Sequence, residues 1–365
     1  MIQRFTTLLF FSLIIMSQNI IAQENSSVFR ADFRGHYGFI MVHRENMSHL
    51  VKGHPYMLEF SLSKATFGEK PWQQLYNFPE MGIAFVYANL ANKKQLGNVY
   101  SIIPNLNFKL NKSEACTMWL RIGAGLGYFP TTFDVLTNHK NLAVSSHLNG
   151  AVNFVLLNRI RLTRKISIEN GLAFTHFSNG AYKMPNLGVN IVTLNTGLSM
   201  LIGDDKKTAV KSPLLPHSKT LDISVIGTMG IKALEAEGEK YSVYSMRILF
   251  DKAISRKSAL GTGFDLVYNT SLFDKLVYDS IFIQKKSAIL QPGINLSYTL
   301  NINKLSLFIN QGLYLNNVDV RSGIIYHRLG FKYKFNNRLI ANITLKTHFG
   351  IADHFEYGIG YTLKR

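Results

Sequence analysis

A histidine and a serine stand two residues apart near the middle of the chain, at His176 and Ser178. In an extended strand alternate side chains share one face, so these two side chains are expected to be neighbours. A serine hydroxyl is a weak nucleophile until an adjacent base removes its proton, and an imidazole can act as that base. The pair therefore predicts the nucleophile and the general base of an ester hydrolase.

Two strands and the loop between them must position this pair. The outgoing strand, expected over 165–178, carries apolar side chains on the face of the pair, among them Ile168, Leu172 and Phe174. A loop with proline and glycine leads to the returning strand, expected over 189–202. A base and a nucleophile at the end of an apolar stripe suit an ester whose chains lie in a membrane.

The loop after the serine offers donors for the oxyanion that forms when an ester carbonyl is attacked. The nearest candidates are the backbone N–H groups of Asn179, Gly180 and Ala181. Asn186 either holds this loop through side-chain hydrogen bonds or is an ordinary turn residue after proline, and the sequence favours neither reading. We treat these four residues as the candidates for oxyanion binding and loop support.

One pattern spans the strand end and the loop: His176-x-Ser178-Asn179, followed by Pro185-Asn186-x-Gly188. It resembles the lipid A 3-O-deacylases, outer-membrane barrels related to the acyloxyacyl hydrolases, over about the first half of the chain. The resemblance implies a serine nucleophile, a histidine base and a glutamate that orients the histidine. It also implies lipid A of lipopolysaccharide as the substrate and the outer membrane as the location.

The chain departs from that family at the third position, where Asn190 stands in place of the glutamate. Alternation places Asn190 on the same face as His176 and Ser178, as a third catalytic residue requires. An asparagine carbonyl can orient an imidazole, but it does not stabilise an imidazolium as a carboxylate does. The enzyme would then be slow, use another acid or work around asparagine. Glu169 is a poor substitute, because alternation puts it on the opposite face.

The first 22 residues are expected to be a cleaved signal peptide, with Arg4, the apolar run 8–16 and a small residue, Ala22, at the cut site. A transmembrane anchor is the alternative. Beyond residue 22 no window of 18 apolar residues occurs, although 47% of the chain is hydrophobic. A secreted chain with many alternating segments predicts an all-β fold, a transmembrane antiparallel β-barrel of the outer membrane. A soluble periplasmic β-sandwich is the alternative fold.

Alternating segments continue through both halves of the chain. We expect strands near 33–43, 55–65, 80–91, 97–110, 116–128, 146–162, 165–178, 189–202, 220–231, 241–252, 257–270, 283–301, 304–315, 323–335, 338–349 and 353–363. Residues 23–203 would form a deacylase-like eight-stranded unit, 204–218 a charged, proline-bearing linker, and 219–365 a second barrel repeat. Tandem barrels and one larger barrel of about sixteen strands both remain open, and the linker favours tandem barrels.

The second half echoes the first but lacks the nucleophile. Thr347-His348-Phe349-Gly350 parallels the segment that ends in Ser178. Alternation turns His348 and Glu356 towards a barrel interior, so we expect lumen residues there and no second site.

The formal net charge of +18 fits an anionic phosphoglycolipid partner. Nothing in the sequence favours nucleic acid. The loop 138–141 and the segment Ser146-His147-x-Asn149 either contact a sugar-phosphate headgroup or form a solvated outer loop. A lone Cys116 leaves no intramolecular disulfide, and we expect no cofactor and no essential metal.

Together with the resemblance to the lipid A 3-O-deacylases, the sequence predicts an outer-membrane serine esterase that hydrolyses the ester bond of an acyl chain of lipid A. The alternative is a non-catalytic outer-membrane barrel, structural or pore-forming, that retains a degenerate motif. A soluble binding module is the third possibility.

Overall fold

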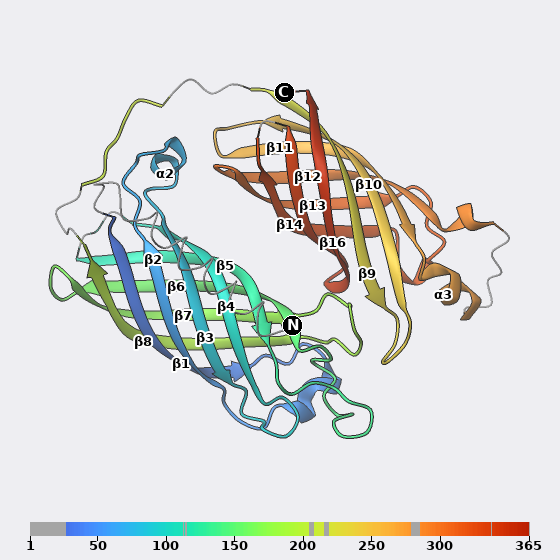
Figure 1. Cartoon of the computed structure of the whole chain (residues 1–365), viewed down its shortest axis with the longest axis horizontal. Coiled ribbons are helices and arrows are strands. Elements are labelled where there is room, and N and C mark those ends of the chain that lie inside the picture. The colour runs from blue at the N-terminus through green and yellow to red at the C-terminus, as the bar shows by residue number, and fades with distance from the viewer. Residues whose placement is uncertain are drawn as a thin grey trace, which may run out of the picture.

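The structure is a computed structural model that describes residues 27–111, 113, 115–203, 208–214, 219–278, 285–336 and 338–364. The expected signal peptide and both ends of the expected linker lie outside these residues. The described chain folds into two closed antiparallel barrels of eight strands each, so the fold is all-β and the barrels are in tandem (Figure 1).

The first barrel holds the candidate catalytic pair and closes where β1 pairs with β8. Its strands are β1 (Phe29–Ile40), β2 (Tyr56–Lys64), β3 (Glu80–Asn89), β4 (Asn98–Lys109), β5 (Cys116–Tyr128), β6 (Leu148–Arg161), β7 (Ile166–Ser178) and β8 (Val189–Ile202). Every strand pairs with its sequence neighbours, so the barrel is a simple up-and-down meander.

The second barrel repeats this plan and closes where β9 pairs with β16. Its strands are β9 (Leu221–Ala233), β10 (Lys240–Ala253), β11 (Ser258–Asn269), β12 (Leu290–Ile302), β13 (Leu305–Tyr314), β14 (Ile325–Lys334), β15 (Leu339–His348) and β16 (Ile351–Lys364). The expected strands are confirmed to within a few residues, except that β12 begins later than predicted.

Five short helices lie in the connections of the described chain and were not predicted from the sequence. They are η1 (Glu45–Leu50), α2 (Pro71–Leu75), α3 (Leu272–Tyr278), η2 (Lys286–Ile289) and η3 (Val320–Ser322). Each is too short to give an amphipathic pattern. The start of α2 is recognisable, because proline is favoured at the first position of a helix and α2 begins with Pro71. Among the described residues no helix is long and apolar enough to cross a bilayer.

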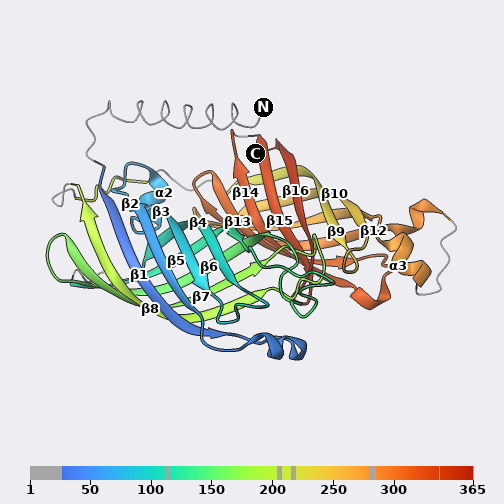
Figure 2. The same cartoon turned by 60° about the horizontal axis from the view of Figure 1, so that its bottom comes forward.

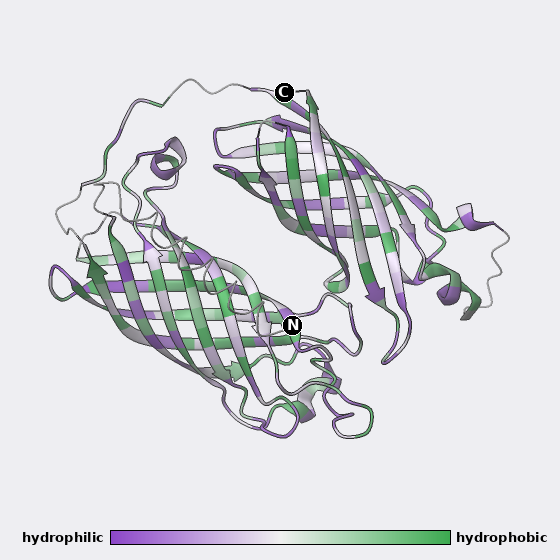
Figure 3. Cartoon of the chain, in the orientation of Figure 1, coloured by the Kyte–Doolittle hydropathy of each residue, from purple (hydrophilic) through white to green (hydrophobic). Residues whose placement is uncertain are grey.

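The strands alternate apolar outward with polar or small inward. On β5, Met118, Leu126 and Tyr128 are exposed on the outer wall, whereas Arg121 and Gly127 point inside. Figure 3 shows the same alternation of hydrophobic and hydrophilic residues along neighbouring strands of both barrels. An apolar outer wall around a polar interior is the pattern of barrels that span a membrane.

Charged side chains fill the middle of the first barrel. Arg34 is fully buried and pairs with Glu59 and Glu169, and Arg159 donates to Glu169 at 2.7 Å. Arg121 adds a second guanidinium 2.6 Å from Glu59. Buried charges are tolerated when each is paired and hydrogen-bonded, as here. Glu169 thus lies inside the barrel, on the side that alternation predicted and away from the candidate site.

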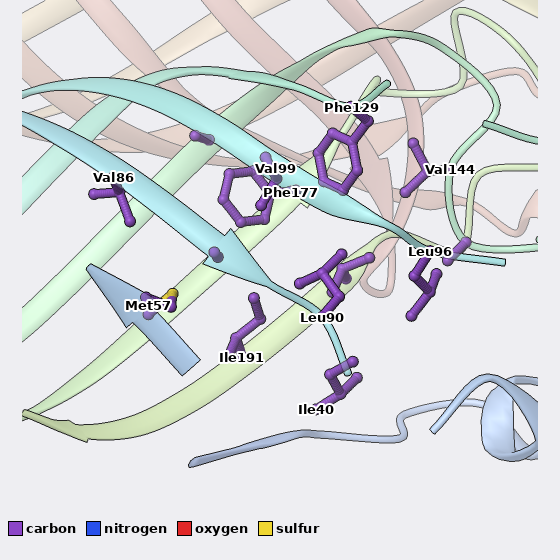
Figure 4. Close-up of a cluster of buried hydrophobic side chains, with 14 of the residues drawn as sticks. Ile40, Met57, Val86, Leu90, Leu96, Val99, Phe129, Val144, Phe177 and Ile191 are labelled. Carbon is purple, nitrogen blue, oxygen red and sulfur yellow. The ribbon is translucent and has the colours of Figure 1, made fainter. Parts of the chain in front are cut away.

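Towards the end of the first barrel that carries its longer loops, apolar side chains replace this network (Figure 4). The cluster contains Ile40, Met47, Leu50, Met57, Ala84, Val86, Ala88, Leu90, Leu96, Val99, Ile103, Phe129, Ala143, Val144, Ala151, Phe177, Val189 and Ile191. It joins strand ends to loop residues, so it fixes the loops that surround the candidate site.

The second barrel has its own ionic interior. Arg328 donates to Asp265 and to Glu356, each at 2.9 Å. His348 contacts the hydroxyl of Tyr314 at 3.3 Å. Glu356 and His348 therefore point into the lumen, as alternation predicted.

The two barrels lie side by side in both views of the chain (Figures 1 and 2). At the linker end Tyr76, at the end of α2, donates from its hydroxyl to the carbonyl of Asn301 at 2.8 Å. The ammonium of Lys257 lies 5.0 Å from the centre of the same ring. Further contacts join the barrels at the opposite end, beside the candidate site.

Candidate active site

The candidate base and nucleophile lie at the end of β7 and share its outer face. Their side chains are partly exposed, whereas Phe177 between them is fully buried. The Phe177 ring packs edge-on against Phe129, with ring centres 5.4 Å apart (Figure 4). Gly127 leaves room for that ring, because a Cβ at this position would lie 2.7 Å from it. Phe177 therefore anchors the strand end from inside while His176 and Ser178 face outward.

Asn190 lies directly opposite His176 in the β7–β8 pairing. Its Oδ1 is 2.5 Å from Nδ1 of His176, and its side chain is buried. Cross-strand partners on one face come close together, so the register itself brings these side chains into contact. The structure thus brings together His176 and Asn190, the pair that alternation predicted.

A second histidine, His43, extends this contact beyond Asn190. His43 follows β1 and lies beside Asn190 because β1 and β8 close the barrel. Its Nδ1 is 3.0 Å from Nδ2 of Asn190, and its Nε2 is 2.9 Å from the carbonyl oxygen of Leu187. Sequence reasoning missed His43, because no local pattern links it to a residue so far along the chain.

These contacts fix the proton positions. The carbonyl oxygen of Leu187 can only accept a hydrogen bond, so Nε2 of His43 must donate to it. Nδ1 of the neutral His43 ring then accepts a hydrogen bond from the amide NH₂ of Asn190. The Asn190 Oδ1 then accepts the proton on Nδ1 of His176. This leaves Nε2 of His176 unprotonated, which is the form that a general base requires.

Asn186 links the serine to the loop that follows it. Its Nδ2 donates to Ser178 Oγ at 2.9 Å, and its Oδ1 accepts from the backbone N–H of Asn179 at 3.1 Å. The N–H of Gly180 also donates to Ser178 Oγ, at 3.2 Å. The N–H of Asn179, one of the three backbone donors predicted for the oxyanion, is therefore already bonded to Asn186. The structure instead puts the Asn186 amide and the Gly180 N–H at the serine, and Ala181 follows with a positive φ of 61°.

The side chain of Asn179 ties this loop to the neighbouring loop between β5 and β6. Its Nδ2 donates to Ser146 Oγ at 3.0 Å and to the carbonyl of Lys183 at 2.9 Å. Backbone bonds from Leu187 and Gly188 to the same neighbouring loop hold the other end. The loop after the serine is thus held on both sides.

His176 and Ser178 approach each other without a direct hydrogen bond among the described residues. A Cβ added to Gly188 would lie 3.1 Å from His176 Cε1 and 3.6 Å from Ser178 Cβ, so Gly188 sits against both side chains. Catalytic hydrogen bonds are often long in substrate-free enzymes and shorten when substrate binds. The positive φ of 76° at Gly188 suits glycine in this crowded position.

The other candidate residues have structural contacts. Asn141 donates to the carbonyl of Gln95 at 2.8 Å, and His147 bonds the carbonyl of Phe129 at 2.7 Å, so both hold outer loops together. Cys116 is exposed on the outer wall. In the part of the chain that the structure describes, no group of three metal-binding side chains gathers.

The echo of the motif in the second barrel has a different local structure. β15 ends at His348, and Phe349 and Gly350 form a tight turn with positive φ, whereas β7 continues through Ser178. Phe349 is exposed, unlike the buried Phe177. The two segments therefore differ both in the direction of the histidine and in the length of the following loop.

Two models of known protein families match the chain. Residues 57–199 match the model described as lipid A 3-O-deacylase (PagL), and residues 220–365 match the model described as acyloxyacyl hydrolase, C-terminal domain. No curated protein matches the chain.

Among solved structures, Neisserial surface protein A is 10% identical, with a TM-score of 0.34, covering 47% of this chain and 96% of that chain. The outer membrane enzyme PagL is 17% identical, also with a TM-score of 0.34, covering 46% of this chain and 97% of that chain.

Proposed function

Because this chain belongs to the lipid A 3-O-deacylase (PagL) family and carries an acyloxyacyl hydrolase C-terminal domain as its second barrel, we propose that it is an outer-membrane serine esterase. Its substrate would be lipid A, from which it removes an ester-linked acyl chain. The hydrogen-bonded series from His43 through Asn190 to His176 carries the proposal. It presents an unprotonated imidazole nitrogen on the face that carries Ser178.

In the first half of the reaction Ser178 Oγ attacks the acyl carbonyl carbon, and its proton passes to Nε2 of His176. The bond between the carbonyl carbon and the sugar oxygen then breaks, and that oxygen takes the proton from His176. In the second half water attacks the acyl-serine with the same histidine as base, releasing the fatty acid and restoring the hydroxyl.

The negative charge on the carbonyl oxygen develops beside Ser178 Oγ. The Nδ2 of Asn186 and the N–H of Gly180 lie within 3.2 Å of that atom, and both can turn to the oxyanion as Oγ bonds to the carbonyl carbon. The backbone N–H of Ala181, the next one along the loop, would be a third donor. Asn190 positions His176, and His43 in turn positions Asn190.

The location of the site supports a lipid substrate. His176 and Ser178 face outward from the barrel wall, and the outer wall below them is apolar, with exposed Leu172 on β7 and Phe154 and Leu156 on β6. An ester whose acyl chains lie along this wall would place its carbonyl at the strand end. The positive net charge suits the phosphates of lipid A.

The test is mass spectrometry of lipid A from cells that express the chain, compared with cells that express Ser178→Ala. We expect the loss of one acyl mass with the wild type only. Both proteins must be folded in the membrane, as judged by the different gel mobility of unheated and heated samples. An unchanged lipid A profile with folded wild-type protein would refute the proposal.

One alternative is a non-catalytic barrel. Asparagine at position 190 favours it, as does Ser178 Oγ being bonded to Asn186 rather than to His176. The same experiment separates the two functions, because the non-catalytic barrel leaves lipid A unchanged in both strains.

A further inference from the structure

The second barrel touches the loop that follows the candidate nucleophile. The backbone N–H of Ala233, at the end of β9, donates to the carbonyl of Ala181 at 2.9 Å. Met184 and Ala236 form an isolated parallel bridge. These bonds join the β9–β10 hairpin of the second barrel to residues 181–184 of the first. The loop after Ser178 therefore contacts both barrels.

A side-chain contact reinforces the backbone bonds. The ammonium of Lys240, at the start of β10, lies 3.7 Å from the ring centre of Tyr182. A cation over an aromatic face is attracted by the ring quadrupole. The loop after the serine is therefore held by charge as well as by hydrogen bonds from the second barrel.

Phe355 of β16 reaches the site most directly. It points outward from the second barrel, on the opposite side of its strand from the buried Glu356. A Cβ added to Gly180 would lie 2.6 Å from Phe355 Cε2, so the aromatic ring occupies the space that a side chain at position 180 would need. Gly180 also has a positive φ of 62°. Both facts make glycine the residue that fits there.

The same ring covers the β6 neighbour of the nucleophile. Gly150 pairs with Ser178 across β6 and β7. A Cβ added to Gly150 would lie 3.3 Å from Phe355 Cζ and 3.3 Å from the carbonyl oxygen of Ser178. Phe355 thus packs beside Ser178 on the outer face of the first barrel, at the seam between the two barrels.

We infer that the second barrel completes the active site of the first, with Phe355 as a positioning residue that seats the 179–184 segment against Ser178. The inference rests on the proposed esterase function. Phe355 presses on Gly180, whose N–H points at the serine oxygen, and the hairpin holds the carbonyl of Ala181. The donors for the oxyanion are therefore aligned by contacts from both barrels. This gives the C-terminal domain a part in catalysis although it lacks a nucleophile.

The experiment compares Phe355→Ala and Phe355→Leu in the full-length protein, with Ile359→Ala as the matched control. Ile359 faces outward on the same strand and is 71% exposed. The substrates are a short p-nitrophenyl ester and purified lipid A. Misplacement of catalytic groups by about 1 Å costs about 10²-fold in rate, so Phe355→Ala should lower kcat by about 10- to 100-fold on both substrates with little change in KM.

Phe355→Leu should restore most of that loss, and Ile359→Ala should leave kcat unchanged. A purely structural role would lower the yield of folded barrel without changing kcat per folded molecule. Unchanged kcat in folded Phe355→Ala would therefore overturn the inference. An equal loss in Ile359→Ala would overturn it as well.

A second measurement does not depend on activity. Met184→Cys with Ala236→Cys, in a Cys116→Ser background, should form a disulfide in the membrane under mild oxidation, because residues paired across a β-bridge lie at disulfide distance. Each single cysteine variant is the control. Absence of this cross-link in folded protein would overturn the inference. A wild type without esterase activity would refute the proposed function, while the cross-link would still report whether the barrels meet here.

Discussion

Replacing His43 with alanine should lower kcat although His43 does not contact the substrate. It would act through Asn190. His43 accepts from Nδ2 of Asn190 at 3.0 Å, and this contact selects the amide orientation that turns Oδ1 towards His176. Without it, the buried amide can rotate by half a turn and present its NH₂ group. His176 would then accept a hydrogen bond at Nδ1 and carry its own proton on Nε2. With that proton in place, Nε2 cannot take the proton of Ser178.

The size of the effect follows from the buried hydrogen bond. Leaving a buried donor without a partner costs about 1–3 kcal/mol. Asn190 is 8% exposed in the intact protein, where His43 is the hydrogen-bond partner of its Nδ2. Converted at about 1.4 kcal/mol per tenfold, the loss corresponds to a fall in kcat of roughly 5- to 150-fold. KM should change little, because His43 does not contact the ester.

The decisive comparison repeats the substitution in an Asn190→Asp background. Either oxygen of a carboxylate accepts from His176, so the aspartate needs no partner to choose its orientation. We expect Asn190→Asp alone to raise kcat by about tenfold or more, since a carboxylate stabilises the imidazolium. His43→Ala should then cost less than about threefold, well below the loss of one buried hydrogen bond.

The assay is the kcat of folded, detergent-solubilised protein on a p-nitrophenyl ester, measured for wild type, both single variants and the double variant. An equal loss from His43→Ala in both backgrounds would show that His43 acts on folding or on the loop at Leu187. No loss in the wild-type background would refute the orientation argument itself. Ser178→Ala gives the uncatalysed baseline.

Three further predictions follow from the site and its supports. Asn186→Ala should lower kcat by about 10²- to 10³-fold, as loss of an oxyanion donor does, and an unchanged kcat would remove Asn186 from that role. Phe177→Ala should destabilise the first barrel by about 3–5 kcal/mol, measured by urea unfolding in detergent, because it empties the space beside Phe129; a change below 1 kcal/mol would contradict this packing. The N–H groups of Thr137 and Leu136 and the hydroxyl of Thr137 hold the pKa of Asp134 below its usual value, so this turn should be intact at neutral pH and open as the pH falls through that lowered pKa. Hydrogen exchange at Leu136 and Thr137, corrected for the intrinsic rate, should lose protection below about pH 4, and pH-independent protection would contradict the prediction.

Alternation along a strand predicted much of the fold and part of the site. Residues of one face recur every second position, so the outward direction of His176, Ser178 and Asn190 could be worked out without coordinates. The same rule placed Glu169 inside, where it pairs with Arg34 and Arg159. Strand boundaries were predictable because turn residues interrupt the pattern.

Other parts of the site depend on contacts that alternation does not report. His43 reaches Asn190 only because β1 and β8 close the barrel, and closure leaves no mark in the local sequence. The bond from Asn186 to Ser178 Oγ depends on the path of an irregular loop. Phe355 reaches Gly180 through the docking of one barrel on another, and its outward apolar side chain resembles any lipid-facing residue.

The filled interior of the first barrel should prevent ions from passing through it. Paired arginine and glutamate side chains occupy its middle, and the apolar cluster that includes Leu90, Phe129 and Phe177 closes it towards the outer loops (Figure 4). Ions would have to displace tightly packed side chains to pass. In a planar bilayer, the full-length protein should therefore show no conductance through its first barrel. The wall of this barrel can serve lipid chemistry while the permeability barrier of the membrane stays intact.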